Sequence, residues 1–173
     1  MTEKQKNIFD TALQLFATEG VDSTSTSKIA KVAGVSEGLI FRHFTNKEGL
    51  LQAILAEGMS QAQVLFKSIA SEPDPKARIR KALEISFGIP KEDYNFWRLV
   101  YTLKWQRGSM ESEAMNEFRA SLAQAFDELN YEDPLSEARL IESILDGIAT
   151  EVLLKDIDPK PLLACILEKY KLT

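Results

Sequence analysis

The sequence predicts an all-α protein of about nine helices, with an N-terminal three-helix helix-turn-helix domain and a larger helical C-terminal domain. Apolar residues recur with a helical period in nearly every segment of the 173 residues. Three Asp-Pro pairs indicate helix starts, because aspartate caps a helix and proline fits its first position. Alternating apolar runs and Asn-Gly turns, which are typical of strands, are absent from the sequence.

The first helix is expected from about Lys4 to Thr18, and Gly20 ends it. Its apolar face is formed by Ile8, Phe9, Ala12, Leu13 and Phe16. The polar stretch that follows leads into a second short helix, for which Thr24 or Ser25 can serve as the cap.

Residues 27–48 read SKIAKVAGVSEGLIFRHFTNKE and are the most informative part of the chain. Gly34 is expected to end the second helix, because glycine adopts the left-handed conformation at low cost. Ser36 can cap the third helix, and Glu37 suits its positive N-terminus. Two short helices joined by a glycine-containing turn form a helix-turn-helix, whose second helix enters the DNA major groove.

A longer helix is expected from about residue 46 to residue 70, opened by a capping box of Thr45 and Glu48. Lys47 lies in its first turn, where a cation opposes the helix dipole. A nearby phosphate would explain this placement.

The segment resembles the N-terminal domain of TetR-type (tetracycline-repressor-like) transcriptional regulators over about residues 3–60. The family pattern of alanine, Gly-Val-Ser, an aromatic residue, His-Phe and Lys-Glu is matched in order, spacing and residue type. The matching residues are Ala30, Gly34, Val35, Ser36, Phe41, His43, Phe44, Lys47 and Glu48. The resemblance implies a DNA-binding head and a helical C-terminal domain that binds a small, often lipophilic ligand and forms a homodimer.

The resemblance also implies which side chains lie at the DNA. The expected DNA-binding residues are Thr26, Ser27, Glu37, Gly38, Leu39, Phe41, Arg42, His43 and Lys47. His43 and Lys47 would contact the phosphate backbone, whereas Arg42 could reach a guanine edge or a phosphate, or be an exposed residue without a role. Glu37 could accept a hydrogen bond from a cytosine amino group or only stabilise the start of its helix.

Three features weaken the expected hold on DNA. Phe41 lacks the hydroxyl of the usual tyrosine, and Ser27 stands where arginine is common in relatives. The net charge is −5, and residues 1–50 hold six basic and six acidic residues, so the head is neutral. Few phosphate contacts should give a modest dependence of affinity on salt.

The remaining helices are expected at about residues 75–88, 92–106, 111–129, 134–155 and 159–171. An aromatic-rich region from Phe87 to Phe126 can be ordinary core or can line an apolar pocket. The candidate ligand-binding residues are Phe66, Phe87, Tyr94, Trp97, Tyr101, Trp105, Met110, Met115, Phe118 and Phe126.

The last two helices carry broad apolar surfaces, which can be monomer core or a four-helix dimer interface. The candidate interface residues are Leu140, Ile144, Gly147, Ile148, Leu162 and Ile166. Gly147 would allow close approach between helices.

The composition sets further bounds. No apolar stretch is long enough to span a bilayer, and the N-terminus is polar and carries acid, so a cytoplasmic protein is expected. Cys165 is the only cysteine, which excludes a disulfide within the chain, and its apolar neighbours predict a buried thiol. Phosphate-binding loops, paired-cysteine metal spacings and nucleophile motifs are absent, so neither an enzyme nor a metal or other cofactor is expected.

Together these observations predict a homodimeric, ligand-responsive regulator, most simply a repressor that binds a palindromic DNA operator. Residues 1–48 would form the DNA-binding domain, residues 49–173 the ligand-binding and dimerisation domain, and the helix at 46–70 would connect them. Ligand and operator would weaken each other's binding reciprocally. The alternative is a helical protein that binds a small molecule or another protein and keeps only a vestigial DNA-binding head.

Overall fold

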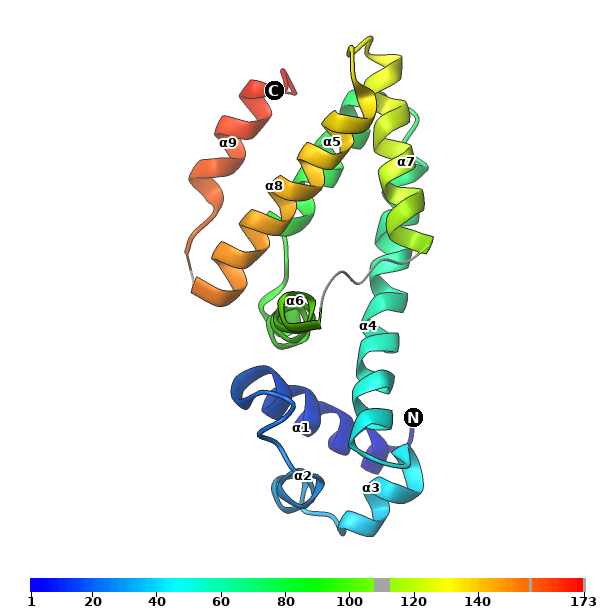
Figure 1. Ribbon diagram of the computed structural model, residues 1–173, viewed down its shortest axis with the longest axis vertical. Coiled ribbons are helices and arrows are strands. Elements are labelled where there is room, and N and C mark those ends of the chain that lie inside the picture. Colours follow the sequence, from blue (N-terminus) through cyan, green and yellow to red (C-terminus); the bar gives the residue numbers. More distant parts are fainter. Residues whose placement is uncertain (108–112, 156, 173) are drawn as a thin grey trace. The chain divides into compact units, whose positions relative to one another are not determined.

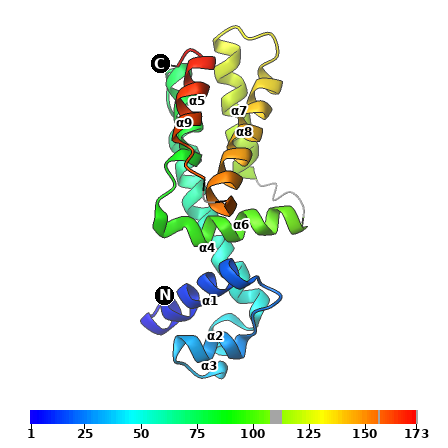
Figure 2. The ribbon, with the colours of Figure 1, turned by 90° about the vertical axis from the view of Figure 1, so that its left-hand side faces the viewer.

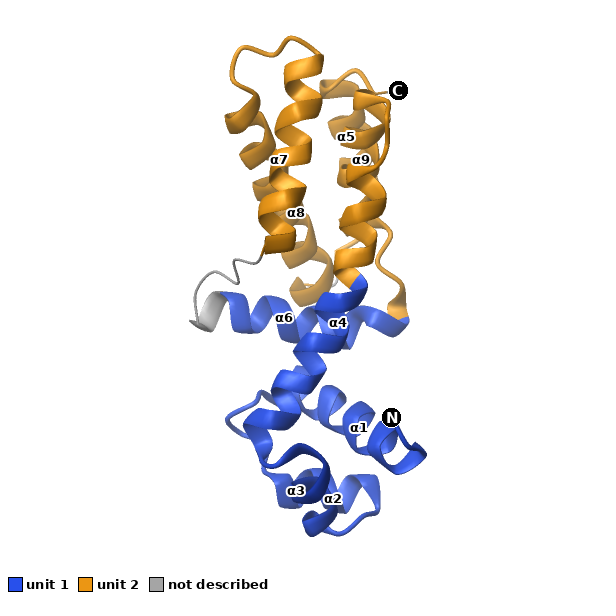
Figure 3. Cartoon of the chain, turned by 90° about the vertical axis from the view of Figure 1, so that its right-hand side faces the viewer, with its two compact units in different colours: residues 1–61, 92–109 blue, residues 62–91, 110–173 orange. Residues whose placement is uncertain are grey.

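The computed structural model describes residues 1–107, 113–155 and 157–172, with residues 105–107 described only in their backbone. This part of the chain contains nine α-helices, two short 3-10 helices and no strand, so the all-α prediction is confirmed. The chain divides into two compact units (Figure 3). Unit 1 joins residues 1–61 and 92–109, and unit 2 joins residues 62–91 and 110–173.

Unit 1 contains the N-terminal helices and one helix from the middle of the chain (Figure 1). Its elements are α1 (Glu3–Glu19), α2 (Thr26–Ala33), α3 (Glu37–Phe44), the first part of α4 (Lys47–Ala70), and α6 (Tyr94–Arg107), preceded by a 3-10 turn at Lys91–Asp93. Helix α6 packs against α1. Ile8, Phe16 and Ile54 are fully buried in this unit, and Leu99 on α6 is 1% exposed.

Most of the predicted helix starts and ends in the N-terminal part of the chain are confirmed. Gly20 follows α1 with a φ of 89°, and Gly34 follows α2 in the left-handed conformation with a φ of 67°. Of the two candidate caps for α2, Ser25 is the one that accepts a hydrogen bond, from the backbone N–H of Lys28. Thr24 is fully buried, and its hydroxyl donates to the carbonyl of Gly20 at 2.8 Å.

The predicted capping box of Thr45 and Glu48 is wrong. Thr45 ends α3 with a φ of 69°, and its N–H donates to the carbonyl of Phe41 at 2.9 Å. Asn46 takes over the capping function, because its side-chain oxygen accepts from the N–H of Gly49 at 2.7 Å. The turn is tight: a Cβ on Gly49 would lie 2.1 Å from the carbonyl oxygen of Phe44.

Unit 2 is a group of helices that run alongside one another (Figure 2). Its elements are the end of α4, α5 (Pro75–Glu84), a 3-10 turn at Ile85–Phe87, α7 (Glu113–Glu128), α8 (Pro134–Lys155) and α9 (Lys160–Lys169). The core combines aliphatic residues with rings, and Phe126 lies at its centre, edge-on to Tyr131 and tilted against Tyr170.

Two of the three Asp-Pro pairs begin a helix as predicted. The carboxylate of Asp74 accepts from the N–H of Ala77 at 2.7 Å, and that of Asp133 accepts from Ser136 at 3.1 Å. The third pair is displaced by one residue, because α9 begins at Lys160 with Pro159 in the cap position. Asp158 still accepts from the N–H of Lys160 at 3.1 Å.

Arg78 on α5 is the one charged side chain that is buried in the described part of the chain, at 6% exposure. Its Nε donates to the carbonyl of Glu72 at 2.9 Å, and its Nη1 donates to the carbonyl of Ser121 on α7 at 3.2 Å. The guanidinium therefore ties the start of α5 to α7 through main-chain oxygens, and its several donors suit this bridging role.

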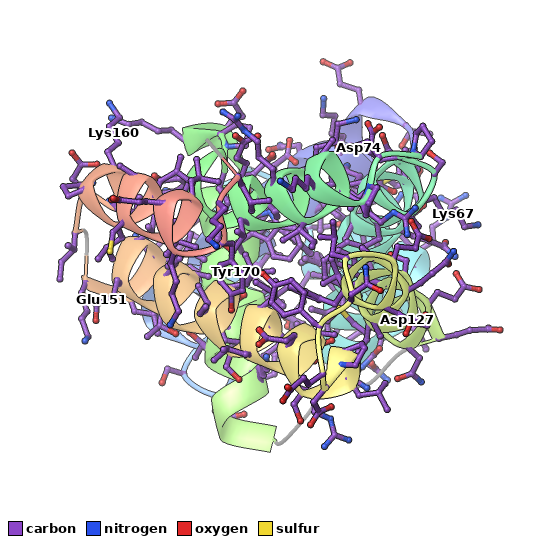
Figure 4. All side chains as sticks on the ribbon, turned by 90° about the horizontal axis from the view of Figure 1, so that it is seen from above. Lys67, Asp74, Asp127, Glu151, Lys160 and Tyr170 are labelled. Carbon is purple, nitrogen blue, oxygen red and sulfur yellow. The ribbon has the colours of Figure 1, made fainter. Side chains whose placement is uncertain are left out.

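Tyr170, just after α9, turns its ring into unit 2 (Figure 4) and is 6% exposed. Its hydroxyl donates to Oε2 of Glu137 on α8 at 3.3 Å. Burial, assisted by the charge and the hydrogen bond of Glu137, raises the pKa of Tyr170 from 10.0 to about 12.

We expect this shift to make unit 2 sensitive to strong alkali. The unfolded chain releases the tyrosine proton near pH 10 and the folded chain near pH 12, so stability is lost as the pH rises between these values. A phenolate absorbance titration should show one of the four tyrosines ionising late. Tyr170→Phe should remove that late phase. A late phase that persists in this variant would assign it to another tyrosine.

The predicted burial of Cys165 is wrong, because its side chain is exposed. The residues of the apolar run LLACIL lie on two different sides of α9. Leu167 is buried against the core, whereas Leu162 is 44% exposed. Cys165 follows Leu162 by three residues and therefore lies on the same outer side.

Candidate nucleic-acid interface

Helices α2 and α3 pack together in unit 1 (Figure 2), joined by the turn at Gly34. Ile29 of α2 and Ile40 of α3 are both fully buried, so each helix turns an apolar side chain into the core of the unit. Val35 and Phe44 are partly buried. The structure thus shows the two-helix arrangement predicted from residues 27–48.

The outer side of α3 is open. Arg42 and Gly38 are exposed, and Phe41 is 47% exposed, which is high for an aromatic ring on a short helix. A Cβ added at Gly38 would meet no atom within 4 Å, so packing within the chain does not require glycine there. Ser27 on α2 is also exposed, whereas the remaining candidates are partly buried: Thr26, Glu37, Leu39, His43 and Lys47.

Two of the candidate DNA-binding residues hydrogen-bond to each other. The hydroxyl of Thr26, at the start of α2, donates to Oε1 of Glu37, at the start of α3, at 2.6 Å. This bond links the N-terminal ends of both helices. It gives Glu37 a role within the head, while its contact with a base stays a prediction.

Lys47 also has a partner within the head. Its Nζ donates to the carbonyl of Val21, in the turn after α1, at 2.9 Å. This bond accounts for a cation in the first turn of α4, a placement for which we had invoked a phosphate. The ammonium group has three donor hydrogens, so it can hold Val21 and a phosphate together.

The basic side chains of the head differ in whether they have a partner within the chain. Lys28 forms an ion pair with Glu19. Arg42 is exposed and makes no hydrogen bond or ion pair with any other described residue. Arg42 is thus a cation on the open side of α3 that is available to an external anion or base.

His43 is held from the far end of α1. Nδ1 of its ring lies 3.2 Å from Nε2 of Gln5, and its ring meets Phe44 edge-on with centroids 6.3 Å apart. Gln5 could not be singled out from sequence alone, because 38 residues separate it from His43.

The candidate ligand-binding residues are divided between the two units. Tyr94, Trp97 and Tyr101 lie on α6 in unit 1 and are partly buried, and Trp105 lies on α6 with its side chain outside the described residues. In unit 2, Phe87 and Met115 are partly buried, and Phe66 stacks on the buried Phe118 with centroids 4.8 Å apart. Phe126 is fully buried in the core, and Met110 lies outside the described residues.

The α4–α6 packing in unit 1 depends on a glycine. A Cβ on Gly58 of α4 would lie 1.8 Å from Cζ of Phe96 on α6, so the ring occupies the space of the missing side chain. Phe96 also meets Trp97 edge-on, with centroids 5.1 Å apart. Helix α4 continues through Gly58 as a single helix from Lys47 to Ala70.

The candidate dimer residues include several exposed apolar side chains. Leu140 on α8 is 42% exposed and Leu162 on α9 is 44% exposed. Gly147 is exposed, and an added Cβ would meet nothing within 4 Å. Leu154, seven residues after Gly147, continues this side of α8 at 43% exposure. Of the remaining candidates, Ile144 and Ile166 are partly buried and Ile148 is buried.

No group of three or more histidine, cysteine, aspartate or glutamate side chains in the described part of the chain could hold a metal ion. No described helix is both long enough and apolar enough to cross a membrane.

Residues 8–54 match the sequence model described as bacterial regulatory proteins, tetR family. The HTH-type transcriptional regulator YvkB of Bacillus subtilis is 45% identical over 60 residues, which cover 35% of this chain and 32% of that protein. The fatty acid metabolism regulator protein of Bacillus subtilis is 28% identical over 149 residues, covering 86% of this chain and 67% of that protein. The chain thus spans about a third of the length of YvkB and about two thirds of the fatty acid regulator.

The fold extends the likeness beyond the head. The structure of AibR, solved in complex with isovaleryl coenzyme A and operator DNA, matches with a TM-score of 0.62 at 19% identity. The match covers 87% of this chain and 98% of that one, and it shows a shared fold. The resemblance predicted from residues 3–60 is confirmed by the family model, these relatives and this fold.

Proposed function

We propose, from the premise that this head belongs to the tetR family, that the protein is a ligand-responsive transcriptional repressor that binds a palindromic operator as a homodimer. The observation that carries the proposal is the open side of α3, where Arg42 is exposed without a partner among the described residues and Phe41 and Gly38 are exposed beside it. A helix in the second position of a helix-turn-helix presents this side to the major groove.

The proposed contacts divide by type. Arg42 reaches a guanine edge, Leu39 a thymine methyl group, and the backbone at Gly38 approaches the DNA closely. Ser27, His43 and Lys47 contact phosphates through their side chains, and Thr26 does so through its backbone N–H at the start of α2, because its hydroxyl already donates to Glu37. Glu37 keeps Thr26 in place and can accept from a cytosine amino group. The two heads of the dimer would reach half-sites about 34–36 Å apart, or a multiple of that spacing.

We assign effector binding and dimerisation to residues 49–173. The partly buried aromatic residues of α6, Tyr94, Trp97 and Tyr101, suit a small lipophilic effector. An acyl thioester is a reasonable class to test, because AibR, which shares this fold, was solved with isovaleryl coenzyme A. The effector must bind the DNA-free state more tightly than the DNA-bound state, since equal affinity for both shifts nothing.

Exposed Leu140, Gly147 and Leu162 support the proposed homodimer. Single exposed leucines are ordinary on a protein surface, but Leu140 and Leu154 lie on one side of α8 with Gly147 between them, and this apolar side is suited to a partner. The proposed place of action is the cytoplasm, where a regulator meets its DNA.

The test is operator affinity across a salt series, using DNA that flanks the protein's own gene. Arg42→Ala should lower affinity by about 10-fold and relax the preference for one base pair. Lys47→Ala should lower affinity for all sequences and reduce the salt slope by about one.

Lys67→Ala is the matched control, because it removes an exposed cation from the last turn of α4, in unit 2. It should leave affinity and salt slope unchanged. Failure of the wild-type chain to select any site, from this DNA and from random sequences, would exclude the proposed function. If Lys67→Ala lowers the affinity and the salt slope as much as Lys47→Ala does, both losses come from the overall charge of the protein and not from a phosphate contact of Lys47.

A further inference from the structure

Gln5 lies in the first turn of α1 and is bonded at both ends of its side-chain amide. Its Oε1 accepts from the backbone N–H of Thr2 at 2.8 Å, while its own backbone N–H donates to the hydroxyl of Thr2 at 3.3 Å. This is a complete capping box. Because a backbone N–H can only donate, the amide oxygen must face Thr2, and the orientation of the amide is fixed.

The other end of the amide then faces His43. Nε2 of Gln5 lies 3.2 Å from Nδ1 of the imidazole, and both side chains are partly buried. An amide NH2 group can only donate, so Nδ1 must accept. A neutral imidazole that accepts at Nδ1 carries its proton at Nε2. The cap of α1 therefore selects one tautomer of a residue at the end of α3.

The imidazole is also fixed in direction. Gln5 binds it at Nδ1, and the ring of Phe44 lies edge-on beside it. Nε2 makes no hydrogen bond to any other described residue, so its N–H remains available. A donor held in one tautomer and one orientation is matched to a single acceptor such as a phosphate oxygen.

We propose that Gln5 is a positioning residue for the DNA contact of His43. Its side-chain oxygen accepts a hydrogen bond from the backbone N–H of Thr2, and its side-chain nitrogen orients the imidazole. The Nε2–H of His43 then donates to a DNA phosphate. This inference rests on the proposed function for its DNA contact. The ordering of the ring does not depend on DNA and is measured separately.

The first experiment reads the tautomer directly. His43 is the only histidine, so long-range proton–nitrogen NMR spectra of the full chain contain a single imidazole. With the ring neutral, the wild-type chain should show the proton at Nε2. Gln5→Glu presents an acceptor in place of the donor and should move the proton to Nδ1. A wild-type ring protonated at Nδ1, or a spectrum unchanged in Gln5→Glu, overturns the inference.

The second experiment couples the two residues through operator affinity. Gln5→Met keeps the length of the side chain and removes its donor, and should lower affinity by about three- to ten-fold, as expected for one hydrogen bond. In a His43→Ala background the same change should cost nothing further, because the two act as one unit. Equal losses in both backgrounds would show that Gln5 acts elsewhere, and would overturn the proposal.

The matched control is Gln14→Met, an exposed glutamine on the same helix. It should leave affinity and the imidazole spectrum unchanged. If the wild-type chain binds no operator, the proposed function fails. The spectra still decide whether Gln5 orders His43, so the two failures are distinguishable.

Discussion

A Leu162→Arg variant should run as a monomer and lose at least about 100-fold in operator affinity. Leu162 is 44% exposed on α9, so the unpaired chain can accommodate an arginine in solvent. In a dimer the same charge would be buried without a partner, which is strongly unfavourable. A monomer engages one half-site at a time and loses the gain in effective concentration that linked heads provide.

Leu135→Arg is the control for this variant. Leu135 is 64% exposed in the first turn of α8 and lies about 140° around the helix from Leu140. It should leave the dimer and its DNA affinity intact. Analytical ultracentrifugation gives the oligomeric state, and an operator titration gives the affinity.

Cys165 offers an independent readout, since it is the only cysteine and lies three residues from Leu162. Its thiol should react slowly with a thiol reagent in the dimer and quickly in Leu162→Arg. A wild-type chain that is monomeric at operator-binding concentrations would remove this interface from the proposal.

Arg78→Met should destabilise the protein by about 3 kcal/mol, because two hydrogen bonds from a charged donor are lost in a buried place. The carbonyls of Glu72 and Ser121 each lose a hydrogen bond, and methionine fills most of the volume without supplying donors. For a chain of this length the melting temperature should fall by roughly 6–12 °C. Differential scanning calorimetry measures both quantities.

Lys76→Met is the matched control, because it removes an exposed cation from the same helix. It should change the melting temperature by little, as is usual for surface substitutions. Arg78→Lys should recover part of the loss, since a lysine can reach only some of the same acceptors. If Arg78→Met and Lys76→Met melt alike, the bonds of Arg78 add nothing to stability.

Much of the fold was predictable because local chemistry determines where helices begin and end. Gly20, Gly34 and the pairs at Asp74 and Asp133 mark boundaries that the structure confirms. The errors arose where more than one local solution exists. Asn46 can cap a helix as well as Thr45 can, and in the structure the cap of α4 is Asn46, while Thr45 ends α3.

The outcome at Cys165 could not be predicted, because an apolar run shows that a helix has an apolar side but not whether that side faces this chain or solvent. The candidate DNA-binding residues came from one short segment with a recognisable pattern. The hydrogen-bond partners of these residues could not be predicted from that segment. Gln5 is 38 residues from His43 in sequence, and Val21 is 26 residues from Lys47. Contacts of that separation depend on how the helices pack.

The composition of unit 1 limits how its N-terminal helices can be exchanged with those of another protein of this fold. The unit is discontinuous in sequence, since α6 packs on α1 after an excursion through residues 62–91. A hybrid protein made by one junction in α4 after position 58 would pair a new α1 with an old α6, and any residue other than glycine at position 58 would clash with the ring of Phe96. Exchange of the N-terminal helices therefore calls for further junctions that bring the matching α6 with them, and a donor that keeps glycine at position 58 removes only the clash with Phe96.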